Sequence, residues 1–413
     1  PVCCTICSGT LTAETLKSDF LYTPDTDYVR RTNVRGPIMP IIEAEFMDLT
    51  SQLDPVAFWE ENRLCREFSE EKPRCALSFS PDDHWIFEFE DVPSTLRYYQ
   101  DKPYRDDIHR TVNAVTREYV GRAFFGEDTF QHQPKRIENL FDCVFHYREG
   151  STPWLLPATD DPRVFADILD RAEGTNVEEW AFPENFLREW ETRARQGRSV
   201  PKLGTGSRGP ATIMTSVIDP GVLFLWMYDD PGLIRRFRDV LAHKMVELNR
   251  AFRRFSGNTE RGWWITDDNC ALFSPALYAE YCAPVLRRVM DEMAPLDAEP
   301  PAVRFQHSDS AMAHLLDQQY ELGIRVVNYG PEVDPGEIRS HMPDAYIQGQ
   351  MPPMLLRDGS PEAIREKVRY DFAAAGKGGG LEIATAGSLA AGTGVGRMRW
   401  LMQVTDQECR LRA

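Results

Sequence analysis

Short apolar runs alternate with long amphipathic segments through the second half of the chain, and each run stops at a polar residue. Runs that are apolar on both faces are typical of strands in a parallel sheet, and the segments between them have helical periodicity. Six such units within roughly 200 residues predict an α/β fold, a (β/α)8 TIM barrel. The predicted strands are Ala211–Val217, Gly262–Asp268, Val303–His307, Arg325–Tyr329, Ala345–Gln350 and Leu381–Thr385.

Two long helices are predicted between these strands, Asp230–Phe255 and Pro275–Met293. Each begins with a polar residue followed by proline, Asp230-Pro231 in the first and Ser274-Pro275 in the second. That order is a strong helix start, because the polar side chain caps free amides and proline has no amide to satisfy.

The first half of the chain is less regular, and residues 1–36 show no clear periodicity. We therefore predict an N-terminal extension over residues 1–36 and one elaborated barrel domain over residues 37–413. The strands predicted in the first half are Ile38–Phe46, Trp85–Glu90 and Pro153–Pro157. The predicted helices are Pro55–Glu70, Asp106–Gly121, Pro134–Phe145, Asp161–Ala172 and Pro183–Arg195, and Lys202–Arg208 is interpreted as a glycine-rich connection.

The net charge of −17 disfavours binding to nucleic acids and to anionic membrane surfaces, because both carry negative charge. No apolar run approaches the ~20 residues of a membrane span, so no membrane association is expected. Nine scattered cysteines, an odd number, favour reduced thiols and a cytoplasmic setting. The cluster Cys3, Cys4 and Cys7 is a weak candidate for metal binding, because no second Cys or His pair is nearby.

Barrel strands present their terminal polar residues to the active site, so the pattern predicts site residues. The predicted catalytic residues are Asp267, Asp268, His307 and Tyr329. The predicted substrate-binding residues are Gln348, Gln350, Glu382 and Arg397, and the predicted metal ligands are His307, Asp309 and Cys270.

Each candidate also has an ordinary structural interpretation. In the acidic pair Asp267 and Asp268, either one residue acts as a general acid or base, or both anchor a loop through hydrogen bonds to backbone amides. Asp309 is either a metal ligand or a helix cap. Tyr329 either orients substrate or packs in the core, and His307 either serves the site or is a hydrogen-bonded histidine under a loop. Two tryptophans, Trp263 and Trp264, are expected to fill core and helix-packing space. Three glycines, Gly392, Gly394 and Gly396, form either an anion site or a flexible loop.

An ordered series of short elements over Gly209–Gln403 resembles the uroporphyrinogen decarboxylase superfamily. The elements are Gly209-Pro210, Asp230-Pro231, Thr266-Asp267-Asp268, Phe273-Ser274-Pro275, Tyr281-Cys282-Ala283-Pro284, His307, Gly323, Gln348-Gly349-Gln350 and Gly359-Ser360-Pro361-Glu362. The resemblance implies a (β/α)8 barrel and, in one branch, methyl transfer to a corrinoid or thiol. The decarboxylases themselves carry an Arg-Gln-Ala-Gly-Arg stretch that this chain lacks. Arg31 and Arg35 share only its spacing.

The methyltransferase branch implies a zinc site made of His-x-Cys and a later cysteine. Here the first motif reads His307-Ser308-Asp309, and the last strand continues as Ala384-Thr385-Ala386-Gly387-Ser388 without cysteine. Imidazole and carboxylate remain competent ligands for zinc or another divalent metal. The candidate partners are a small-molecule substrate, a corrinoid protein and a second copy of the chain.

Three functions therefore stay open. The first is a methyltransferase in which His307 and Asp309 bind a metal or protonate the leaving heteroatom, with the acid supplied by Asp267 or Asp268. The second is a decarboxylase or lyase acting on a small carboxylate or tetrapyrrole, with Arg31, Arg35 or Arg397 binding the carboxylate. The third is a non-catalytic ligand-binding barrel that has lost the zinc site.

Overall fold

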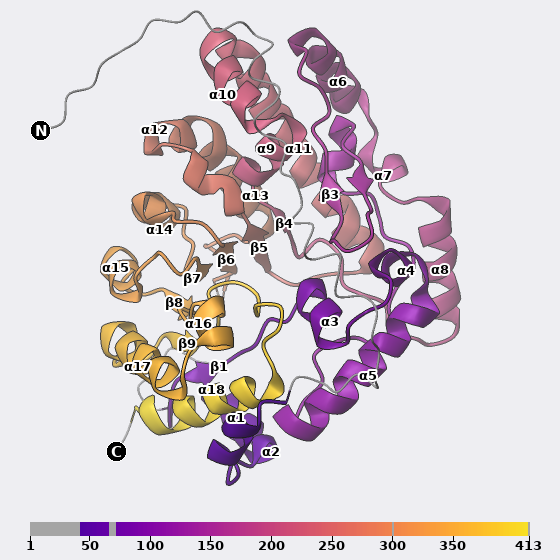
Figure 1. The fold of residues 1–413 in the computed structure, drawn as a ribbon. Coiled ribbons are helices and arrows are strands. Elements are labelled where there is room, and N and C mark those ends of the chain that lie inside the picture. Colours follow the sequence, from indigo (N-terminus) through magenta and orange to yellow (C-terminus); the bar gives the residue numbers. More distant parts are fainter. Residues whose placement is uncertain (1–41, 66–71, 300, 412–413) are drawn as a thin grey trace, which may run out of the picture. The chain divides into compact units, whose positions relative to one another are not determined.

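Seven parallel strands form one sheet in the order β1-β9-β8-β7-β6-β5-β4 (Figure 1). The computed structural model describes residues 42–65, 72–299 and 301–411. From β4 to β9 each strand pairs with the next one along the chain, which is the order around a (β/α) barrel, and β1 then pairs with β9. The strands are β1 (Ala76–Leu77), β4 (Gly206–Arg208), β5 (Gly262–Thr266), β6 (Val303–Ser308), β7 (Val326–Tyr329), β8 (Tyr346–Gln348) and β9 (Leu381–Ile383).

The predicted α/β fold with a parallel sheet is therefore confirmed. Within the described residues no ladder joins β4 to β1, so hydrogen bonding leaves a free edge at β4. Three of the predicted site residues, Asp268, His307 and Asp309, lie at the carboxyl ends of β5 and β6, on the side of the sheet where the loops after parallel strands begin.

Helices surround the strands in Figure 1. In the first half they are α1 (Ala44–Leu49), α2 (Pro55–Asn62), α3 (Asp83–Phe89), α4 (Thr95–Gln100), α5 (Lys102–Val120), α6 (Pro162–Gly174), α7 (Val177–Trp180) and α8 (Glu184–Arg195). In the second half they are α9 (Pro210–Val217), α10 (Pro220–Asp229), α11 (Pro231–Ser256), α12 (Pro275–Leu277), α13 (Ala283–Met293), α14 (Leu316–Glu321), α15 (Pro335–His341), α16 (Pro353–Asp358), α17 (Pro361–Asp371) and α18 (Val395–Glu408). The predicted helix Pro275–Met293 is continuous through a π-helical segment, Tyr278–Cys282.

The prediction that Ala211–Val217 is a strand was wrong, because this segment belongs to α9. Its side chains, including those of Thr212 and Thr215, are buried on nearly every side, and a run that lacks an exposed polar face has no period that separates strand from helix. The strand that pairs with β5 is instead β4, inside the segment Lys202–Arg208 that we interpreted as a connection. Only three residues long and starting with glycine, β4 has none of the usual strand signals.

Three further strand predictions fail in the first half. Of Ile38–Phe46, the described part enters helix α1. The segment Trp85–Glu90 lies largely within helix α3, where the Trp85 amide donates to the capping Asp82 carboxylate. The predicted barrel strand at Pro153–Pro157 contains β3 (Trp154–Leu155), which pairs antiparallel with β2 (Phe145–His146) and not with the sheet. The predicted helix Pro134–Phe145 shortens to a 3₁₀ turn at Ile137–Phe141.

The glycines before α18 bind an anion that belongs to the chain itself. The amides of Gly394 and Gly396 each donate to the Glu43 carboxylate, at 3.0 Å in both cases. A carboxylate at a helix N-terminus satisfies free amides and complements the helix dipole. Glu43 therefore joins the start of α1 to α18, and the loop is neither open nor free for an external anion.

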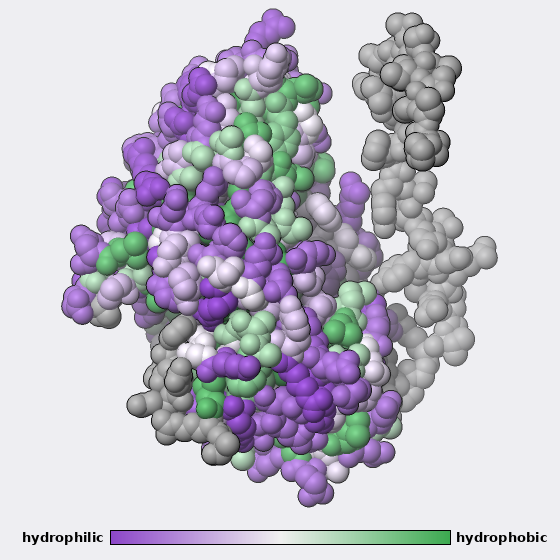
Figure 2. Space-filling model, turned by 90° about the vertical axis from the view of Figure 1, so that its left-hand side faces the viewer, coloured by the Kyte–Doolittle hydropathy of each residue, from purple (hydrophilic) through white to green (hydrophobic). Residues whose placement is uncertain are grey.

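No single helix within 42–65, 72–299 and 301–411 has the length and apolar character of a membrane span. The bent pair α9 and α10, with 97° between the two helices, passes that test by length and composition only. In Figure 2 hydrophobic residues gather in the upper part of the face that carries α10. Leu225 of α10 is 62% exposed.

Candidate functional site

One row of side chains crosses four strands at the same level. The strand register pairs Arg208 with Thr266, Thr266 with His307, and His307 with Asn328. Register partners in a parallel sheet point to the same face and lie about 4.8 Å apart. The row therefore brings an arginine, a threonine, a histidine and an asparagine together, although the chain separates the first and last by more than a hundred residues.

Two carboxylates meet His307 at the end of this row. The distance from its Nε2 atom is 3.1 Å to Asp309 Oδ1 and 3.6 Å to Asp268 Oδ1. The Asp309 amide also donates to Asp268 Oδ1 at 3.1 Å, which links the loops after β5 and β6. One possible ligand atom from each of these three residues lies within 4.8 Å of the others. The three groups form the cluster Asp268–His307–Asp309, which we call the acidic triad.

Asn328 determines which nitrogen of His307 is available. Its Nδ2 group donates to the carbonyls of Gln348 and Thr385, at 2.6 and 3.0 Å, so its Oδ1 must be the atom that faces His307. The His307 Nδ1–H donates to that oxygen at 2.7 Å. A neutral imidazole with its proton on Nδ1 has a lone pair on Nε2, and this lone pair points at the carboxylates.

The triad also favours a proton on His307. Burial alone lowers the pKa of His307, but the hydrogen bond and charge of Asp309, the charge of Asp268 and the Asn328 contact together raise it above its ordinary value. A positive charge at Nε2 is therefore stabilised by the two carboxylates. A divalent cation would meet the same electrostatic environment.

Close packing of glycine positions Asp309. A Cβ atom added to Gly387 would lie 2.2 Å from Asp309 Oδ1, and one added to Gly330 would lie 2.4 Å from the Asp309 carbonyl oxygen. The φ angle of Gly387 is +95°, which side chains other than glycine rarely adopt. The two glycines thus allow the loop after β9 and the end of β7 to approach the acidic triad.

Asp267 lies beside the triad but is directed into the fold. It is fully buried, its Oδ1 accepts from the Thr212 amide at 2.8 Å, and its own amide donates to the His307 carbonyl at 2.9 Å. Burial raises the pKa of Asp267 to about 7, against the lowering effect of the Thr212 hydrogen bonds. Of the predicted acidic pair, Asp268 is the member whose side chain faces the His307 imidazole, and the Asp267 side chain anchors the start of α9.

Cys270 and Tyr329 are both fully buried beside the triad's strands. The Cys270 sulfur lies 3.4 Å from Ser308 Oγ, and burial raises the pKa of its thiol to about 12. It is not part of the acidic triad, in which Asp268 takes the third position. The Tyr329 hydroxyl donates to Gln306 at 3.0 Å, and burial raises its pKa well above the ordinary value.

The predicted substrate-binding residues lie in two regions. Gln348, Gln350 and Glu382 lie on or just after β8 and β9, and Arg397 lies on α18. Gln348 and Glu382 are register partners, and Gln348 Nε2 lies 3.5 Å from Glu382 Oε2, which also accepts from Tyr346 at 2.9 Å. Gln350 is 1% exposed, and both polar atoms of its side chain lack a hydrogen-bond partner among the described residues. Arg397 lies on α18, where it donates to the carbonyls of Leu356 and Gly359 and faces Glu43.

Five predicted candidates, Cys3, Cys4, Cys7, Arg31 and Arg35, lie outside the described residues.

Sequence reasoning missed Arg208 and misjudged Trp264. Arg208 fell in a supposed connection, and its place in the row becomes visible only when β4 is paired with β5. Trp263 is buried as expected, at 2%, but Trp264 is 43% exposed. Alternation along β5 would have indicated this, since neighbouring strand residues point to opposite faces.

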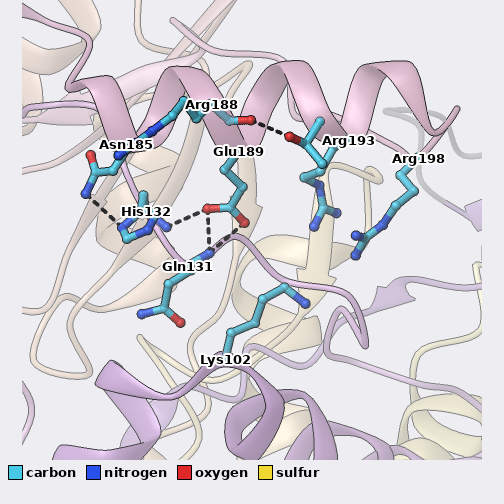
Figure 3. Close-up of a pocket in the computed structure, with 9 residues that line it drawn as sticks. Lys102, Gln131, His132, Asn185, Arg188, Glu189, Arg193 and Arg198 are labelled. Atoms are coloured by element: carbon cyan, nitrogen blue, oxygen red, sulfur yellow. Dashed lines mark hydrogen bonds between the residues drawn. The ribbon is translucent and has the colours of Figure 1, made fainter.

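A cavity of about 500 Å³ lies away from the acidic triad, beside α8 and Lys102 at the start of α5 (Figure 3). Four cationic side chains line it, but the carboxylates around them balance their charge. The pairs are Lys102 with Asp106 and Asp128, Arg193 and Arg198 with Asp128, and Arg188 with Glu184, while Glu189 accepts from the amides of Gln131 and His132. This cavity therefore has no excess charge to recognise an anion, and its network joins the ends of α5 and α8.

Substituting Asp128 by asparagine should lower the free energy of unfolding by about 1 kcal/mol at neutral pH, a value limited by its partial exposure. Burial raises the pKa of Asp128, but hydrogen bonds from Arg198, Lys102 and Arg193 hold it well below the ordinary value. A depressed folded-state pKa stabilises the fold above the unfolded pKa of about 3.9, and that contribution is lost as the pH falls through the folded-state pKa.

Urea unfolding should accordingly show a difference between wild type and Asp128→Asn that is constant near neutral pH and shrinks below about pH 4. Asp107→Asn is the matched control, because the Asp107 side chain is 75% exposed and its ion-pair partner among the described residues is Arg110 alone. A difference that grows on acidification would contradict the assignment of Asp128 as the acceptor of this network.

Comparison with known proteins agrees with this fold. The family model described as uroporphyrinogen decarboxylase (URO-D) matches residues 151–407. A methyltransferase from Methanosarcina mazei superposes with a TM-score of 0.53 at 13% identity, over 84% of this chain and 97% of its own, which shows the fold. A B12-independent methionine synthase from Shewanella sp. in complex with selenomethionine gives a TM-score of 0.37 at 11% identity, over 81% and 95% of the two chains. No curated protein matches in sequence. Because the family match spans more than half of the chain, this protein belongs to the uroporphyrinogen decarboxylase family of enzymes.

Proposed function

We propose that this enzyme transfers a methyl group between a small organic donor and a corrinoid or thiol carrier, with the acidic triad at the centre of the reaction. The observation that carries the proposal is the meeting of Asp268, His307 and Asp309 at the carboxyl ends of β5 and β6. Barrel enzymes place their chemistry at this end of the strands.

The side chains of the triad fit a divalent cation. Two ionised carboxylates and a neutral imidazole carry two negative charges, and the hydrogen bond from Nδ1 to Asn328 directs the Nε2 lone pair toward the same point. Histidine ligands commonly have such an outer hydrogen bond. Nitrogen and oxygen donors without thiolate suit zinc or a harder metal. A cation held there would supply Lewis acidity to the heteroatom that carries the methyl group.

In the transfer, the bond from the heteroatom to the methyl carbon breaks and a bond from the carrier's cobalt or sulfur to that carbon forms. The heteroatom retains the bonding electrons and needs a proton, because an alkoxide or amide anion leaves poorly. Without a metal, His307 is the residue placed to donate this proton, since Asp268 and Asp309 stabilise its imidazolium form. Measuring the metal content of the purified protein distinguishes a metal bound at His307 Nε2 from a proton there.

The charge of the row bears on the alternative functions. A tetrapyrrole with eight carboxylates requires many cations, yet the row that contains His307 includes one arginine, Arg208. That single arginine favours, as a second candidate, a decarboxylase or lyase acting on a small carboxylate. A non-catalytic ligand-binding barrel is the third alternative.

The test is an assay of both reactions with the same metal-supplemented protein. Methylated amines, thiols and ethers are supplied with reduced cobalamin or a free thiol as acceptor, and methylcobalamin is followed by absorbance. Carbon dioxide release from a panel of carboxylic acids is measured in parallel. Methyl transfer that disappears in Asp309→Asn supports the proposal, whereas carbon dioxide release alone supports the second candidate and excludes the first.

A further inference from the structure

A cavity of about 450 Å³ lies at the free edge of β4. Its walls come from β4, β5, the 3₁₀ turn Ile137–Phe141 and α11. The volume is within the range of pockets that hold small organic molecules. The cavity includes Arg208 and Thr266, which are the first two members of the row that continues to His307.

The row sets the distance between this cavity and the triad. Arg208 lies two strands away from His307, and strand spacing of about 4.8 Å puts their backbones roughly 10 Å apart. Thr266 lies between them on β5, and it precedes Asp268 in the chain by two residues. A single small molecule can therefore contact Arg208 with one end and approach the acidic triad with the other.

Trp264 forms a flat apolar wall of the cavity. Its indole ring lies directly on the backbone of Gly206, because a Cβ atom added there would lie 2.2 Å from the ring. The indole Nε1 donates to Thr205 Oγ1 at 3.1 Å, which holds the ring in this orientation. The ring is nevertheless 43% exposed, so part of its surface is open to the cavity. Leu248 and Phe252 of α11 complete an apolar lining suited to a planar ring.

The polar part of the lining recognises one negative charge. Two arginines, Arg136 and Arg208, and one glutamate, Glu138, line the cavity, which leaves one positive charge in excess. Arg208 Nη1 contacts Glu138 at 3.2 Å, and within the described part of the chain its Nε and Nη2 groups make no hydrogen bond. The Arg208 side chain is 31% exposed, whereas that of Glu138 is 2% exposed. The buried Glu138 carboxylate thus fixes Arg208 through Nη1, and the remaining guanidinium donors of Arg208 are available to a carboxylate in the cavity.

We infer that the substrate of this site is an aromatic carboxylate, bound with its ring against Trp264 and its carboxylate on Arg208. This inference rests on the proposed function, because it assigns a substrate class to the same site. The carboxylate is an anchor and not the reacting group, because Arg208 lies two strands away from His307.

Binding of 2-naphthoate and 2-naphthamide, measured by calorimetry on the full chain, tests the inference. The two probes share size and planarity but differ in charge. We expect naphthoate to bind at least tenfold more tightly to the wild type. Arg208→Met should remove that preference and Arg208→Lys should restore part of it, while Trp264→Leu should weaken both probes. Arg250→Met is the matched control, because Arg250 pairs with Glu292 on the surface.

Equal binding of the two probes to the wild type would overturn the inference, and this comparison does not depend on any variant folding. Unchanged binding in folded Arg208→Met would also overturn it. His307→Ala separates this inference from the proposed function, because we expect it to bind naphthoate normally. Methyl transfer without naphthoate preference refutes the inference alone, and naphthoate preference without metal or methyl transfer refutes the proposed function alone.

Discussion

His307→Ala should abolish tight binding of a divalent metal and, with it, turnover. The His307 Nε2 atom faces both carboxylates of the acidic triad, at 3.1 Å from Asp309 Oδ1 and 3.6 Å from Asp268 Oδ1. Its removal leaves two carboxylates on separate loops without the nitrogen ligand between them. Because loss of an outer-shell partner alone typically costs 10–100-fold in metal affinity, we expect a loss on the order of 100-fold or more. Metal content after dialysis and titration with zinc, manganese and cobalt measure it.

His341→Ala is the matched control for this prediction. His341 also pairs with a carboxylate, since its Nδ1 lies 2.7 Å from Asp317, but the pair is exposed and has one acid only. We expect this variant to bind metal and turn over as the wild type does. Retention of one equivalent of metal in His307→Ala would contradict the acidic triad as the metal site. A wild type that binds no metal yet transfers methyl groups would instead favour His307 as the proton donor.

The three members of the triad were recognisable from sequence because strand ends in a barrel carry the site. His307 and Asp268 each follow an apolar run, and Asp309 stands two residues after His307. Sequence alone did not separate Asp267 from Asp268, since adjacent residues differ only in which way the chain turns them. The structure turns Asp267 toward Thr212 and Asp268 toward His307.

The free edge of the sheet at β4 could not be predicted from the sequence, and the reason is physical. Strand β4 is three residues long and begins with glycine, so no hydrophobic alternation announces it. Helix α9 follows, and although it contains Thr212 and Thr215 it is buried on nearly every side, so the segment was interpreted as the missing strand. Arg208 and Trp264 acquire their positions from the pairing of β4 with β5, a contact between residues more than fifty positions apart. Long, strongly periodic helices such as α11 were predicted within one or two residues because local signals specify them.

Asn328→Leu should produce the largest loss of stability among single substitutions at the site, about 3–5 kcal/mol in the free energy of unfolding. The Asn328 side chain donates to the carbonyls of Gln348 and Thr385 and accepts from the Gly387 amide at 3.1 Å and from His307 at 2.7 Å. Leucine has the same shape but no polar atoms, so these buried groups lose their partners at once. Each unsatisfied buried group costs about 1–3 kcal/mol.

The same substitution should weaken metal binding by about 10–100-fold, because His307 loses the acceptor that fixes its Nδ1–H tautomer. Gln350→Met is the matched control, since it also replaces a buried amide by an apolar side chain of similar length. The Gln350 amide has no hydrogen-bond partner among the described residues, so we expect its replacement to leave stability unchanged or slightly higher. Urea unfolding and metal titration measure both effects. Equal destabilisation by the two variants would mean that burial of an amide, and not the four bonds of Asn328, determines the loss, and the role of Asn328 in orienting His307 would then be wrong.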